Sequence, residues 1–162
     1  MLESARRAAA DDLDVLTSLA SSATLELREL RGGARLTADL DAAITAAGAL
    51  ADHLDDPERL TVVGEFAEVA IGLAIVHLDR RGAAPYGVVD VLYVEPPARE
   101  VGVAEAMMDI VVDWCRDAGC RGIDAWALPG SRPAKAFLEA HGFITRLLTM
   151  HRPLPPAGRE EG

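Results

Sequence analysis

The chain has 162 residues with a formal net charge of -10, and half of its residues are hydrophobic. This length fits one domain that can bury a sizeable core. The negative charge argues against a nucleic-acid or anionic-membrane partner, because both require a basic surface. No apolar stretch approaches the ~20 residues that cross a bilayer, and the N-terminus lacks the apolar core of a signal peptide, so we expect a cytoplasmic protein.

The first half of the chain predicts one short strand followed by two helices. Asp11 and Asp12 offer capping oxygens where helical spacing of apolar residues begins. Gly32 and Gly33 end that pattern, and Pro57 follows the end of the next one. We expect a strand at residues 6–9 and helices over residues 13–30 and 40–54.

The second half predicts a sheet with two more helices. We expect strands at residues 61–66, 68–78, 88–94, 122–128 and 143–151, and helices at 101–118 and 131–141. This order indicates an α/β protein with three layers, α/β/α, around a mixed, mostly antiparallel sheet. Residues 1–152 would form a single domain, and the polar, proline-rich residues 153–162 a disordered tail.

The most informative segment runs from Val91 to Ala104, where a hydrophobic strand enters a turn marked by two prolines and a helix begins at once. The N–H groups of a first helical turn have no partner within the helix, and the helix dipole adds positive charge there. Gly102 would let a diphosphate approach the backbone closely, and Arg99 adds bidentate donors. The pattern predicts an anion site built from main-chain donors.

Two motifs resemble those of the GNAT acyl-CoA N-acyltransferases. Arg99-x-x-Gly102-x-Ala104 resembles the R/Q-x-x-G-x-G/A signature that holds the coenzyme A pyrophosphate. Ser131-x-x-Ala134-x-x-Phe137-Leu138-Glu139-x-x-Gly142-Phe143 resembles the later N-x-x-A-x-x-x-Y-E-x-x-G-F motif. The resemblance covers residues 61–152 and implies a GNAT-like fold with acetyl-CoA as co-substrate. The residues it implies at the cofactor are Leu92, Tyr93, Val94, Arg99, Glu100, Val101, Gly102, Val103, Ala104, Ser131, Ala134 and Phe137.

Two positions depart from the family pattern. Glu100 stands where glycine is common, beside the expected phosphate site. Leu138 replaces the tyrosine that protonates the departing thiolate, and leucine has no proton to give. The thiolate therefore leaves unassisted, another group donates the proton, or catalysis has been lost.

The proton acceptor has one main candidate. The glutamate base of the histone-acetylating members would fall at Val88, which cannot serve. If side chains alternate regularly, Asp90 shares a face with Val88, Leu92 and Val94. Asp90 would accept the amine's proton directly or through a water, or else pair structurally with an arginine or cap a loop. Tyr93, on the other face, is a second catalytic candidate as a proton donor, or a core residue.

The sequence thus predicts an N-acetyltransferase that moves an acetyl group from acetyl-CoA directly to a primary amine of a small molecule or peptide. Neither the cysteines nor the histidines show metal-ligand spacing, so no metal is expected. The alternative is a catalytically weak or inactive acyl-CoA-binding sensor or interaction module, which Val88 and Leu138 favour. A homodimer is left open.

Overall fold

The computed structural model describes residues 1–40, 44 and 48–158. The helices and strands are β1 (Glu3–Arg7), α1 (Leu13–Glu29), α2 (Gly33–Leu40), α3 (Ala49–Asp55), β2 (Arg59–Phe66), β3 (Val69–Asp79), β4 (Tyr86–Val94), α4 (Val103–Asp117), β5 (Gly122–Ala125) and α5 (Arg132–Ala140). The strands lie in the order β1-β2-β3-β4-β5. Neighbours are antiparallel except β4 and β5, which are parallel. The predicted mixed, mostly antiparallel sheet is confirmed.

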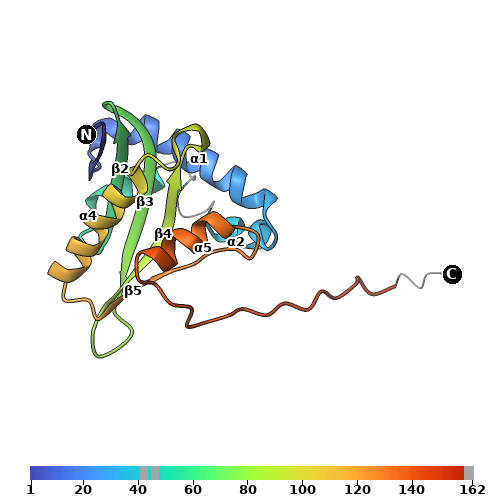
Figure 1. Ribbon diagram of the computed structural model, residues 1–162. Coiled ribbons are helices and arrows are strands. Elements are labelled where there is room, and N and C mark those ends of the chain that lie inside the picture. The colour runs from blue at the N-terminus through green and yellow to red at the C-terminus, as the bar shows by residue number, and fades with distance from the viewer. Residues whose placement is uncertain (41–43, 45–47, 159–162) are drawn as a thin grey trace.

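Helices cover both faces of this sheet (Figure 1). On one face α4 buries Met107, Met108 and Val111 against β2, β3 and β4, and all three are at most 2% exposed. On the other face α1 buries Leu16 and Leu19 against the alternate residues of the same strands. The three-layer α/β/α arrangement is therefore confirmed. Within the described residues, no helix combines the length and apolar character needed to span a membrane.

An ion pair connects β1 to the start of α1. β1 itself lies earlier in the chain than predicted. β1 occupies Glu3–Arg7 rather than residues 6–9. The Asp12 side chain does not cap α1, but it caps the 3-10 turn Ala10–Asp12 by accepting the Ala9 N–H at 2.7 Å. Its two oxygens each accept a 2.8 Å bond from Arg6. The Arg6 guanidinium lowers the pKa of Asp12. The carboxylate thus anchors β1 to the start of α1.

The helix predicted over residues 40–54 was wrong in extent. The structure has two shorter helices, α2 and α3, and most of the chain between them, residues 41–43 and 45–47, lies outside the described residues. α1 ends at Glu29 and its C-cap residue, Leu30, is extended, so the glycine cap predicted for this helix was wrong. Gly32, with φ +83°, lies in the turn between α1 and α2, which begins at Gly33. α2 was not predicted, because the sequence analysis began the second helix only at residue 40.

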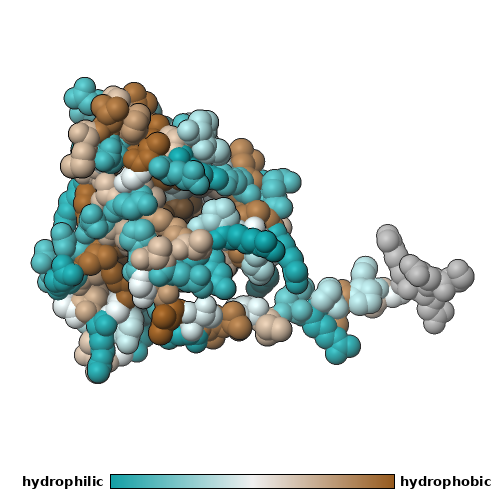
Figure 2. All heavy atoms as spheres, viewed as in Figure 1, coloured by the Kyte–Doolittle hydropathy of each residue, from teal (hydrophilic) through white to brown (hydrophobic). Residues whose placement is uncertain are grey.

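The last predicted strand, residues 143–151, was also wrong. Residues 143–158 contain no helix or strand, and Figures 1 and 2 show this segment leading away from the body with apolar residues along it. Its exposed apolar side chains are Ile144, Leu147, Leu148, Met150 and Leu154. A strand needs the backbone hydrogen bonds of a neighbour; this segment contacts β5 through a side-chain pair of Arg146 with Asp124.

Two facing glycines let α4 approach the sheet closely at its N-terminal end. Gly64 on β2 pairs with Gly72 on β3. A Cβ built on Gly64 would lie 2.5 Å from Val103 Cγ1 and 2.8 Å from the Met107 sulfur. Overpacking of this kind costs about 1–3 kcal/mol.

We therefore expect Gly64→Ala to lower the free energy of unfolding by about 1–3 kcal/mol in denaturant titrations. The double variant Gly64→Ala with Val103→Ala removes the nearest clashing methyl group. It should lose less than the two single substitutions added together. If the losses in the free energy of unfolding are additive, α4 does not pack directly against Gly64.

Candidate functional site

A β-bulge places Asp90 in the middle of β4. In the β3–β4 register, Ile75 faces Val91 and Val76 faces Val89, so Asp90 is the extra residue. The bulge breaks the regular alternation that the sequence analysis assumed. Val89, Leu92 and Val94 pack on the α4 side, whereas Val91 and Tyr93 pack on the α1 side. The predicted common face of Asp90 with Leu92 and Val94 was therefore wrong.

The same point marks a parting of β4 from β5. β5 pairs with β4 only as far as Val89, which faces Ala125. Among the described strands, residues 90–94 of β4 consequently have no partner on that side, and we call this opening the β4–β5 split. The Glu95 N–H donates to Ile71 on β3 at 2.9 Å. Since successive strand amides point to opposite neighbours, the N–H groups of Leu92 and Val94 face the split, and that of Tyr93 faces β3.

Asp90 is held by a histidine that the sequence analysis did not select. His77 Nδ1 lies 2.6 Å from Asp90 Oδ2. Because His77 alternates with Ile75 and Leu73 on β3, both of which are buried under α1, the pair lies on the α1 side of the sheet. The side chains are 34% and 23% exposed, respectively. Both groups are therefore partly open to solvent, beside the split.

Tyr93, the second catalytic candidate, lies in the core beneath α1. It is 9% exposed. Burial raises the pKa of its phenol, and the carboxylate of Glu26 on α1 raises it further. The hydroxyl thus stays protonated at neutral pH, in a packed position under α1.

Arg99 ties the end of β4 to α1. Its Nε donates to the Val94 carbonyl at 2.9 Å, and its Nη2 donates to both oxygens of Glu26 at 2.8 and 2.6 Å. The guanidinium also lies 5.7 Å from the centre of the Tyr93 ring. The side chain predicted to reach the diphosphate is thus engaged by Glu26 and Val94 in this structure.

The N-terminus of α4 presents unbonded backbone N–H groups at the end of β4. Gly102 is the N-cap residue with φ +87°, and within the described part of the chain no side chain caps this helix. The carbonyl of Gly102 accepts the first helical bond, from the Ala106 N–H at 3.0 Å. A Cβ on Gly102 would meet the Glu3 side chain at 3.2 Å, so β1 closes one side of this turn. The N–H groups of Val103, Ala104 and Glu105 belong to the first turn and lack helical acceptors.

The position where the family favours glycine has a left-handed backbone. Glu100 is exposed and has φ +71°. Such a conformation costs an L-residue roughly 1–2 kcal/mol but is free of this penalty for glycine. Val101, the next residue, is half-buried and packs on the α4 side of the sheet.

We expect Glu100→Gly to raise the free energy of unfolding by about 1 kcal/mol, because it relieves the left-handed strain. Glu100→Ala removes the same charge but keeps a Cβ, and it should give no such gain. Thermal or urea unfolding of the two variants measures the difference. An equal gain in both would assign the effect to charge instead of backbone conformation.

The later motif lies on α5, on the α4 side of the split. Phe137 and Leu138 pack against the same core cluster as Leu92. Phe137 also stacks on His141, with ring centres 4.1 Å apart. Ser131 is the N-cap residue of α5, but its hydroxyl makes no capping bond. Ala134 is half-buried one turn into the helix.

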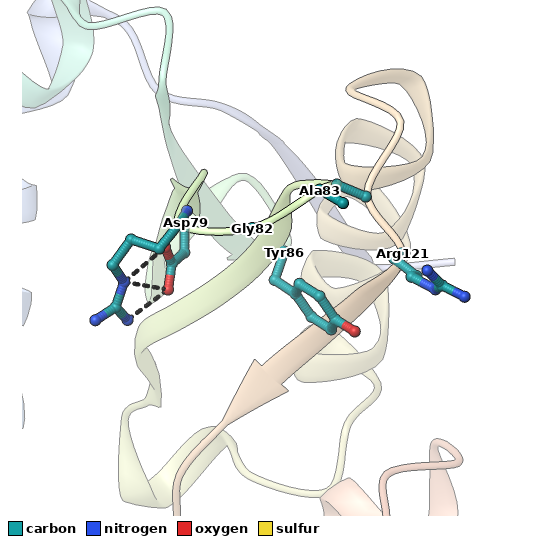
Figure 3. A pocket seen from close by; sticks show the side chains of 7 residues that line it. Asp79, Gly82, Ala83, Tyr86 and Arg121 are labelled. Carbon is teal, nitrogen blue, oxygen red and sulfur yellow. Dashed lines mark hydrogen bonds and ion pairs between the residues drawn. The ribbon is translucent and has the colours of Figure 1, made fainter.

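A shallow pocket lies at the other end of β4, away from the split (Figure 3). It is lined by Asp79, Arg81, Gly82, Ala83, Ala84, Tyr86 and Arg121. Arg81 is already engaged by Asp79, with Nε bonds of 2.9 and 3.0 Å. This pocket brings together none of the residues that the two motifs select. Across the described ranges, no three His, Cys, Asp or Glu side chains form a group that could hold a metal ion.

Known proteins share the fold of this chain, and a family model matches most of its length. The family model described as the acetyltransferase (GNAT) family matches residues 24–143. The aminoglycoside N-acetyltransferase AAC(6')-Iy in complex with CoA superposes with a TM-score of 0.71 at 20% identity, covering 93% of this chain and 94% of that one. No curated protein matches the chain.

Two further solved structures show the same fold. An aminoglycoside acetyltransferase from an uncultured soil metagenomic sample has a TM-score of 0.70 at 14% identity, with 96% and 100% of the two chains covered. A protein described as a putative acetyltransferase from Agrobacterium tumefaciens has a TM-score of 0.69 at 19% identity, with 93% and 99% covered.

Proposed function

Since the chain belongs to the acetyltransferase (GNAT) family, we propose that it transfers an acetyl group from acetyl-CoA directly to a primary amine. The observation that carries the proposal is the coincidence of three features along residues 90–94 of β4 and the turn that follows them. These are the open strand edge of the β4–β5 split, the uncapped N-terminus of α4 and the partly exposed Asp90 carboxylate.

The diphosphate of acetyl-CoA would bind at the first turn of α4. The N–H groups around Val103 and Ala104 point out of the helix, and the helix dipole favours an anion there. The pantetheine arm would lie along the split, where the Leu92 and Val94 amides are open to it. Such amides can hold the amide groups of pantetheine and polarise the thioester carbonyl.

Asp90 would accept the proton that the amine loses, directly or through one water. The reaction forms a bond between the amine nitrogen and the acetyl carbon and breaks the bond from that carbon to the CoA sulfur. The amine proton goes to Asp90, and the electron pair of the broken bond leaves with the thiolate. A proton acceptor within reach contributes typically ~10²–10⁴ in rate.

The thiolate would leave without a side-chain acid. Leu138 has no proton to donate, and the Tyr93 hydroxyl is buried beneath α1 with a raised pKa. We assign Tyr93 a role in packing and in the contact with Arg99. Solvent would supply the proton that the thiolate takes up.

The experiment measures release of CoA thiol from acetyl-CoA in the presence of an amine panel. The panel contains polyamines, aminoglycosides, amino acids and peptides; aminoglycosides enter because two structural neighbours are named for them. We expect thiol release with at least one amine and an acetylated product of matching amount by mass spectrometry. Binding of acetyl-CoA with no turnover of any amine would favour the acyl-CoA-binding module.

A further inference from the structure

The bulge leaves Asp90 without ladder support from either neighbouring strand. On the β3 side, the pairing passes from Val89 directly to Val91. On the β5 side, it ends at Val89. A residue at such a position needs another contact to fix its side chain, because a displacement of about 1 Å in a reacting group can cost ~10²-fold in rate.

The contact that fixes it is the bond from His77. As the proton acceptor of the proposed function, Asp90 would be an ionised carboxylate that can only accept hydrogen bonds, so His77 Nδ1 would be the donor in this 2.6 Å pair. His77 itself sits in a regular part of β3, where it faces Arg59 of β2 and Val88 of β4 in the register. It therefore supports Asp90 from a position that is paired with both neighbouring strands.

The neighbouring charged side chains Arg59 and Asp79 are engaged by other residues, and Asp90 is the carboxylate that His77 binds. Arg59 turns to α3, where its Nη1 lies 3.4 Å from His53 Nε2. Asp79, further along β3, is engaged by Arg81. His53 is buried with its Nε2 against Arg59, and burial together with Arg59 lowers the pKa of His53.

We infer that His77 is a positioning residue for acetyl transfer: its Nδ1–H holds Asp90 Oδ2, which leaves Oδ1 to take the proton of the amine. The inference rests on the proposed function, because it concerns the same proton transfer. The chemistry does not require His77 to touch either substrate.

The test compares two substitutions at this position. His77→Asn keeps a side-chain N–H donor close to the place of Nδ1, whereas His77→Leu keeps bulk and removes the donor. We expect His77→Leu to lower kcat about 10- to 100-fold with an unchanged KM for acetyl-CoA. His77→Asn should retain most of the activity. His151→Leu, in the exposed C-terminal segment, is the matched control and should behave as wild type.

Two kinetic results would overturn the inference. If His77→Leu is as active as wild type, Asp90 needs no support from His77. If His77→Asn is as impaired as His77→Leu, the reaction requires the imidazole itself and not a donor to Asp90. Thermal unfolding of both variants establishes that each is folded at the assay temperature.

Nitrogen NMR of histidine-labelled protein gives a readout that does not depend on turnover. At about pH 8, where an imidazole is ordinarily neutral, we expect His77 in the Nδ1-protonated tautomer in wild type and a changed tautomer balance in Asp90→Ala. An Nε2-protonated His77 in wild type would contradict the pairing. If the wild-type protein acetylates no amine, the proposed function is wrong. The NMR result would show separately whether the His77–Asp90 pair forms, so failure of the function and failure of the pairing can be told apart.

Discussion

Asp90→Asn should lower kcat/KM for the amine by at least about 100-fold at neutral pH, because it removes the proton acceptor. The substitution keeps the size of the side chain and an oxygen that can accept the His77 bond. Binding of acetyl-CoA should be unchanged, because its diphosphate would bind at the first turn of α4. That turn follows the C-terminal end of β4, whereas the bulge lies in the middle of the strand. Steady-state kinetics at saturating acetyl-CoA measure the loss.

The pH dependence of this variant provides a second signature. The fraction of neutral amine rises with pH, so Asp90→Asn should recover part of its activity in alkaline solution, whereas wild type gains less. Asp79→Asn is the matched control, a half-buried aspartate at the other end of the strands that is engaged by Arg81. Equal rates for Asp90→Asn and wild type would show that Asp90 is structural and that the amine proton leaves through water.

Ala104→Glu should weaken acetyl-CoA binding by at least tenfold, which corresponds to about 1.4 kcal/mol. The new carboxylate would stand in the first turn of α4, where it repels a diphosphate at the same N–H groups. The helix itself should tolerate an acid there, because a first-turn acid interacts favourably with the helix dipole. Calorimetric titration with acetyl-CoA measures the affinity.

The control for this variant is Ala104→Gln, which has the same shape without the charge. Ala104 is half-buried against the α4-side core, so both variants also report any cost of the larger side chain. The difference between the two affinities isolates the charge. If Ala104→Glu and Ala104→Gln bind acetyl-CoA equally well, the diphosphate lies away from the N-terminus of α4.

Local sequence signals predicted the parts of the fold that local chemistry decides. The apolar stripe of Met107, Met108 and Val111 predicted α4 because one face of that helix is buried. The sequence around Gly102 predicted the succession of strand, turn and helix that the structure has there; the anion site at this turn stays a prediction. Both features depend on residues close together in the sequence.

The features that the sequence did not predict depend on contacts between distant segments. The bulge at Asp90 is a property of the register between β3 and β4, and alternation along β4 alone does not reveal it. The role of His77 requires that register as well, since the pair is separated by 13 positions in the chain. The engagement of Arg99 by Glu26 joins α1 to the end of β4 across 73 positions.

The central claim, that one site at the end of β4 holds acetyl-CoA, is tested most directly by amide NMR of ¹⁵N-labelled protein titrated with acetyl-CoA. We predict that the largest shifts fall on the amides of Leu92 and Val94 at the split and of Gly102, Val103 and Ala104 at the start of α4. Shifts confined to Ala83, Ala84 and Tyr86, which line the pocket at the other end of β4, with no change at the split, would contradict the claim.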